Sequence, residues 1–145
     1  MMQPLKPFLP FLALAAGCLA ASGALAQIDG SKPVICATAE VMECVPVQAC
    51  QRVSARDARV PRFIRIDFAA KTLTRNIEGD EVASDIERSE TVDGRLILQG
   101  AEDGFEEVRD GIGWSLSIDQ ELGDMVLTGS GDGVAFVIFG ACTLP

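Results

Sequence analysis

The sequence predicts a mainly β domain, a small antiparallel meander closed as an up-and-down β-barrel and held by two disulfides, with a two-sheet sandwich as the alternative. Short segments alternate apolar and polar residues with a period of two, as in residues 63–68. The hairpin dipeptides Asp93-Gly94 and Asp132-Gly133 separate such segments. Four cysteines follow the first 26 residues, and the chain contains no histidine. Disulfides are therefore favoured over a zinc site.

The first 26 residues have the features of an export signal. Lys6 precedes an apolar run over residues 8–21, and residues 24–26 match the small-x-small pattern that signal peptidase cleaves. The run is short and ends at this pattern rather than at a basic cluster, so we expect a cleaved signal peptide over residues 1–26. The mature protein would then be periplasmic or secreted, with no transmembrane segment after processing.

A second route of export starts at Cys18. Residues 14–18 loosely resemble a bacterial lipobox, in which the cysteine is lipidated and becomes the first residue. The leucine lies one position too far upstream, and the apolar run continues past Cys18. A lipoprotein anchored through Cys18 is therefore the alternative to ordinary cleavage.

Residues 27–145 are short enough for a single domain. We expect residues 27–60 to form a cysteine-containing N-terminal segment and residues 61–145 to form the meander. Residues 27–33 are polar and predict a flexible or extended lead-in. Residues 34–42 predict the first strand, with a short helix as the alternative. Ser54 could cap a short helix, but Pro61 would end it within two turns.

The meander is predicted from segments that alternate in polarity and are bounded by turn residues. The last segment has apolar residues on both faces, which predicts a central or otherwise covered strand. Trp114 is in phase with Leu116 and Ile118, so we expect it in the core. The predicted strands cover residues 63–68, 72–76, 85–92, 95–99, 113–118, 125–130 and 134–142.

The cysteines allow three pairings, and the sequence excludes none of them. A bridge between Cys44 and Cys50 is favoured because Pro46 can turn the short loop between them. Cys36 would then pair with Cys142 and close a loop of about a hundred residues, which the chain-entropy model expects to be strongly stabilising. This pairing would also bring the first and last strands together.

Charge limits the classes of partner. Residues 27–145 hold 11 basic and 21 acidic residues, a net charge of −10, which argues against nucleic-acid binding. The partner is unknown, with a cationic protein or a small apolar ligand as the expected kinds. A basic cluster could contact an anion or pair with the protein's own carboxylates. Its members are Arg52, Arg56, Arg59, Arg62 and Arg65.

Function is predicted mainly by exclusion. The chain has no histidine and no tyrosine, which removes the Ser-His-Asp arrangement, and the glycines of residues 129–133 fit a hairpin better than a phosphate loop. No catalytic residue, metal or cofactor is expected. We therefore expect an exported, non-enzymatic binding or interaction domain; a carrier of small ligands would need a barrel wide enough to leave an apolar cavity.

Two alternatives remain: an envelope structural protein, and an acidic proteinaceous inhibitor of a cationic envelope or extracellular enzyme. An inhibitor would need a protruding acidic loop, and residues 101–113 are the best candidate. Its possible partner contacts are Glu102, Asp103, Glu106, Glu107 and Asp110.

The export signal leads to a direct prediction about the mature N-terminus. Sequencing the exported protein should start at Gln27, because signal peptidase cleaves after the small residue Ala26. A lipidated Cys18 at the start would support the lipoprotein route instead. An intact Met1 on the exported product would contradict both.

Overall fold

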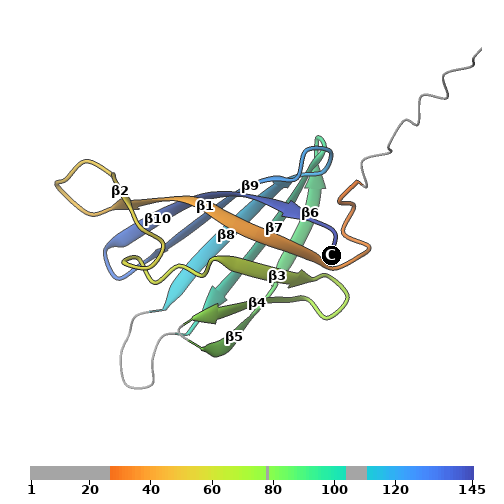
Figure 1. Ribbon diagram of the computed structural model, residues 1–145, viewed down its shortest axis with the longest axis horizontal. Coiled ribbons are helices and arrows are strands. Elements are labelled where there is room, and N and C mark those ends of the chain that lie inside the picture. Colours follow the sequence, from red (N-terminus) through yellow and green to blue (C-terminus); the bar gives the residue numbers. More distant parts are fainter. Residues whose placement is uncertain (1–26, 78, 104–110) are drawn as a thin grey trace, which may run out of the picture.

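The computed structural model describes residues 27–77, 79–103 and 111–145, which form a ten-stranded antiparallel sheet curled into a half-barrel (Figure 1). The predicted mainly β fold is confirmed. Within these ranges no residue is helical, and no helix is long and apolar enough to cross a membrane. The strands are β1 (Val34–Cys44), β2 (Gln51–Val53), β3 (Phe63–Asp67), β4 (Thr72–Ile77), β5 (Asp80–Asp85), β6 (Arg88–Val92), β7 (Arg95–Glu102), β8 (Ile112–Asp119), β9 (Asp124–Gly131) and β10 (Val134–Thr143).

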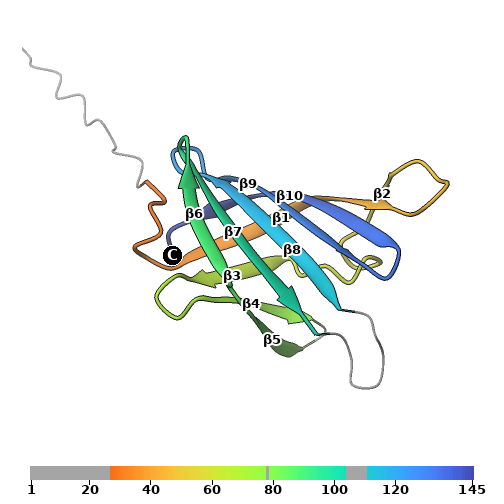
Figure 2. The same cartoon turned by 180° about the vertical axis from the view of Figure 1, so that it is seen from behind.

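The strand order is that of a meander whose two ends have been joined. The sheet runs β5-β4-β3-β1-β10-β9-β8-β7-β6, with the short β2 added to β1. From β3 to β5 and from β6 to β10, each strand lies beside the strand that follows it in sequence, and β1 pairs with β10 from the other end of the chain (Figure 2). This pairing places the first and last strands at the centre of the sheet.

The two edges of the sheet are consecutive in the chain. Only Ile86 and Glu87 separate β5 from β6, and they bridge the two sides of the half-barrel. The Ile86 N–H donates to the Lys71 carbonyl before β4, at 2.8 Å, and the Glu87 N–H donates to the Gln99 carbonyl of β7, at 2.9 Å. The chain thus changes its hydrogen-bond partner from the β4 side to β7 at these two residues. The curled sheet brings its edge strands β5 and β6 together, but no ladder of backbone hydrogen bonds joins their described residues.

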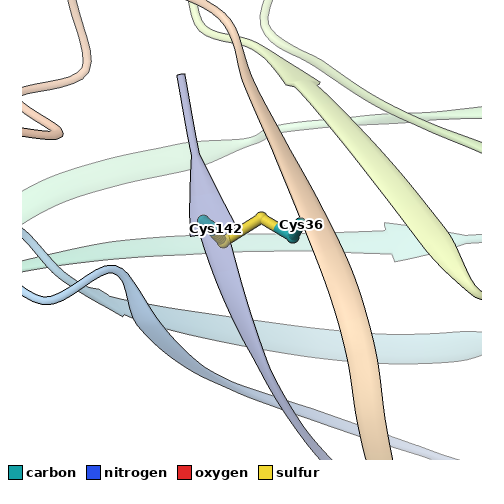
Figure 3. Close-up of a disulfide and its surroundings, with 2 residues drawn as sticks. All are labelled: Cys36 and Cys142. Atoms are coloured by element: carbon teal, nitrogen blue, oxygen red, sulfur yellow. A yellow bond between two sulfur atoms is a disulfide. The ribbon is translucent and has the colours of Figure 1, made fainter. Parts of the chain in front are cut away.

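The disulfides have the expected pairing. Cys36 lies directly opposite Cys142 in the β1–β10 ladder, and their side chains meet between the strands (Figure 3). The second bridge joins Cys44 to Cys50 across the turn between β1 and β2. Two disulfides indicate that the protein folds in an oxidising compartment.

The core lies on the concave face of the sheet. Inward residues alternate with outward ones along the strands, as in β8, where Trp114, Leu116 and Ile118 are buried. Trp114 is therefore a core residue as predicted, and its Nε1–H donates to Ser84 Oγ at 2.9 Å. Almost completely buried side chains fill the centre: Val34, Cys36, Val41, Ile64, Ile66, Leu98, Leu116, Ile118 and Met125.

Several predicted elements need correction. Residues 85–92 hold the last residue of β5 and the whole of β6 rather than one strand, because the chain changes partner at residues 86 and 87. The rest of β5 was missed. Strand β2 was also missed, since three residues are too few to show a period. Residues 55–59 form turns and no helix, although Ser54 Oγ does accept the Asp57 N–H at 3.0 Å.

The N-terminal lead-in is more firmly held than its polar sequence predicts. Ile28 is buried, its N–H donates to the Gln120 carbonyl, and its carbonyl accepts from Gln120 Nε2. Strand β10 is central as predicted, but its outward Phe139 is 41% exposed. The second face of β10 is therefore not fully covered.

The predicted turns are confirmed by their backbone. Asp93-Gly94 and Asp132-Gly133 have positive φ at both residues, between 47° and 76°, as hairpin turns of two residues require. In the turn between β8 and β9, Gly123 has φ 77°. There the backbone N–H groups of Leu122 and Glu121 donate to Asp119, which lowers the pKa of that carboxyl.

The two disulfides should differ in their effect on stability. Replacing Cys36 and Cys142 by Ala should lower the melting temperature more than replacing Cys44 and Cys50. The bridged residues are separated by 106 and 6 positions, respectively. The chain-entropy model converts these lengths into a difference of about 2.5 kcal/mol. Equal losses, measured by thermal unfolding of both double variants, would contradict this account.

Gly100 is predicted to be essential for closing the half-barrel. A Cβ there would lie 2.4 Å from both the Asp85 carbonyl oxygen and the Trp114 ring. Gly100→Ala should therefore destabilise the protein by about 1–3 kcal/mol, as overpacking does. The control is Gly113→Ala on the adjacent strand, where a Cβ meets nothing within 4 Å. Equal denaturant midpoints for the two variants would contradict this prediction, because they would show that the backbone near Gly100 and Asp85 shifts at no cost in stability.

Candidate ligand-binding cavity

One end of the half-barrel is filled and the other is hollow. At the filled end, Ile28, Leu96, Ile118 and Met125 are all at most 4% exposed. At the opposite end a cavity of about 730 Å³ opens between the strands and the turn before β3. Its apolar lining includes Val60, Ile64, Leu73, Val82, Ile112, Trp114, Leu127, Phe136 and Ile138.

The cavity is hollow partly because a glycine occupies an inward position between two aromatic residues. Gly129 of β9 lies opposite Trp114 of β8 and Phe136 of β10 in the two ladders, and all three line the cavity. A Cβ at Gly129 would have only ordinary contacts, the nearest at 3.5 Å to Ile112. No neighbouring side chain occupies the space that a larger residue at position 129 would fill, so this space belongs to the cavity.

An ion pair is the main polar feature of the cavity wall. Arg75 of β4 and Glu102 of β7 lie across the seam between the two sides, and the guanidinium and carboxylate form a two-pronged pair. The Nη1 to Oε1 distance is 2.5 Å, and the second prong joins Nη2 to Oε2. Only 15% of the Arg75 side chain and 22% of the Glu102 side chain are exposed. The pair is thus largely shielded from solvent.

The position of Arg75 follows from the strand register. It lies opposite Ile64 of β3 and Val82 of β5, and it is in phase with the buried Leu73. The ladder therefore turns Arg75 inward among apolar neighbours. Glu102 lies opposite Ile112, a lining residue, in the β7–β8 ladder. Two charged side chains that are held inward by register need each other as partners.

Other charged residues stand at the rim. Arg59, Asp80 and Asp103 line the opening and are exposed. Together with the inner pair, the lining holds two positive and three negative side chains. The cavity is therefore apolar inside, with a slight excess of negative charge at its mouth.

The predicted acidic contact surface is only partly described. Glu102 faces Arg75 inside the cavity, and Asp103 follows it at the rim. Glu106, Glu107 and Asp110 lie outside the described residues, as does most of the loop considered for an inhibitor. Contact of these residues with a partner stays a prediction.

The structure spreads the predicted basic cluster over the surface. Arg52 lies opposite Met42, and Arg65 lies opposite Ile35, which comes seven residues earlier in β1. At about 3.3 Å per residue, this separates their backbones by roughly 23 Å. Arg52 pairs with Glu40 at 2.7 Å. These two arginines do not meet at one site, and Arg56, Arg59 and Arg62 lie in the connection between β2 and β3.

The sequence reasoning missed Arg75. The available signal was phase: in the strand predicted over residues 72–76, Arg75 shares a face with Leu73, the one apolar residue of that segment. No sequence pattern identified its partner, which is 27 residues away. For the part of the chain that the structure describes, no group of three or more acidic or cysteine side chains is arranged to hold a metal ion. No protein-family model, curated protein or solved structure matches the chain.

Proposed function

We propose that this protein is an exported binding domain that takes a small apolar ligand into the hollow end of its half-barrel. The observation that carries the proposal is the asymmetry of the interior. The same curled sheet is packed with side chains at one end and leaves about 730 Å³ at the other.

The cavity has the composition of a small-molecule site. Ligand cavities commonly measure about 300–1,000 Å³ and combine apolar and aromatic walls with a few placed polar groups. Here Trp114, Phe136 and several aliphatic side chains form the wall, and one ion pair supplies the polar groups. Burial of an apolar ligand against this wall would be favoured by the hydrophobic effect.

Export and the non-enzymatic role complete the proposal. The disulfides indicate an oxidising compartment, and the export signal predicted in residues 1–26 favours the periplasm or the extracellular medium. In such water-filled surroundings a poorly soluble molecule needs a protein to hold it. Binding without turnover fits a chain that has no histidine and no tyrosine to serve as acid or base.

A neutral fluorescent probe tests the cavity directly. The oxidised mature protein should bind N-phenyl-1-naphthylamine saturably, with one probe per chain. Gly129→Leu should weaken binding by about tenfold or more, because its side chain fills the space between Trp114 and Phe136. The measurement is a fluorescence titration, with circular dichroism to show that the variant is folded.

The matched control is Thr128→Leu. Thr128 precedes Gly129 in β9 and is exposed on the outer face of the sheet. The substitution therefore adds a leucine side chain outside the cavity. It should leave probe affinity within about twofold of the original value. Equal effects of the two variants, or no saturable binding by the unaltered protein, would refute the cavity as the binding site.

A further inference from the structure

We infer that the ligand is an uncharged amphiphile, an apolar chain that ends in an oxygen-bearing group such as an alcohol or ester, and that the Arg75–Glu102 pair recognises this group. The inference rests on the proposed function and specifies the ligand class for the same cavity. It follows from the hydrogen-bonding capacity of the pair, its charge and its position.

The Arg75 guanidinium lines the cavity and has hydrogen-bond donors that Glu102 does not use. A guanidinium carries five N–H donors. Two of those on Arg75 are directed to Glu102, and no other described residue accepts from the remaining three. No fully buried side-chain nitrogen or oxygen of the described residues lacks a hydrogen-bond partner, so a guanidinium nitrogen without a protein acceptor is open to water. An oxygen acceptor on a ligand would take the place of that water.

The charges at this site disfavour a charged ligand. Arg75 is already neutralised by Glu102, so a ligand carboxylate would gain little net attraction and would meet the negative charge of Glu102. Asp80 and Asp103 at the rim add to this repulsion. A ligand cation would meet the Arg75 guanidinium and would lose its hydration inside an apolar cavity. An uncharged acceptor avoids both costs.

The position of the pair suits a ligand with one polar end. Ile64 and Val82 flank Arg75, and Ile112 flanks Glu102, so apolar wall surrounds the pair. A chain lying against Trp114 and Phe136 could therefore reach the pair with its end group while remaining on apolar surface.

Ligands that share one chain and differ in the end group test the inference. Dodecanol, methyl dodecanoate, dodecanoate and dodecyltrimethylammonium should each displace N-phenyl-1-naphthylamine from the oxidised mature protein at neutral pH. The two charged ligands are kept below their micelle-forming concentrations and the two uncharged ones below their solubility limits. The two uncharged ligands should bind about tenfold more tightly than either charged one. A carboxylate that binds as tightly as the alcohol and ester would overturn the inference.

Single substitutions should change the preference in opposite directions. Glu102→Gln removes the compensating charge while keeping an acceptor for Arg75, so dodecanoate should gain about tenfold relative to dodecanol. Arg75→Gln leaves Glu102 uncompensated and should shift the preference towards dodecyltrimethylammonium. If neither variant alters the order of affinities, the pair does not recognise the end group.

A double variant separates this inference from the proposed function. Arg75→Met with Glu102→Leu replaces the pair by apolar side chains, a change that buried ion pairs often tolerate without loss of stability. It should still bind N-phenyl-1-naphthylamine, but the affinities of dodecanol and methyl dodecanoate relative to this probe should fall by about tenfold, because their end group loses its hydrogen-bond partner. Unchanged relative affinities would refute the role of the pair. Failure of every ligand to bind the unaltered protein would refute the proposed function and this inference together.

Discussion

The pairing of β1 with β10 is the constraint on which the rest of the structure depends. It joins strands at opposite ends of the chain, and the Cys36–Cys142 bridge locks the register at one place. Gly140 allows this close approach, because a Cβ there would lie 2.1 Å from the Ala37 carbonyl oxygen. The two meanders extend from either side of this pair, and the twisted sheet that they form is curled into a half-barrel. The free edges then meet at residues 86 and 87.

The disulfide and the cavity lie towards different ends of the same interior. Cys36 and Cys142 are buried near the packed end, where Ile28 and Met125 contribute to the core. The other bridge, Cys44–Cys50, is local and lies towards the hollow end, since Cys44 is opposite Ala135 beside the lining residue Phe136. There the Arg75–Glu102 pair joins β4 to β7. A buried ion pair is a weak source of stability, because desolvation offsets much of its attraction. The packed end can therefore hold the fold together while the other end keeps its cavity.

Local sequence patterns predicted those elements that local physics controls. The alternation of Ile64 and Ile66 identified β3, and both residues are almost completely buried. Asp-Gly pairs predicted the hairpins because few other residues adopt positive φ at both positions. The prediction failed at β2, which depends on pairing with β1, and at residues 86 and 87, where the chain changes partner. Neither feature has a period that a sequence pattern could show.

The sequence by itself determined the class of fold, the kinds of turn and the buried face of most strands, because these depend on residues close together in the chain. It also favoured the correct cysteine pairs without excluding the others. Tertiary structure alone decided the candidate site. The hollow beside Gly129 arises from its neighbours on β8 and β10, and Arg75 meets Glu102 only because the curled sheet brings β4 opposite β7. Such contacts depend on the curvature of the whole sheet, which no local segment of the chain encodes.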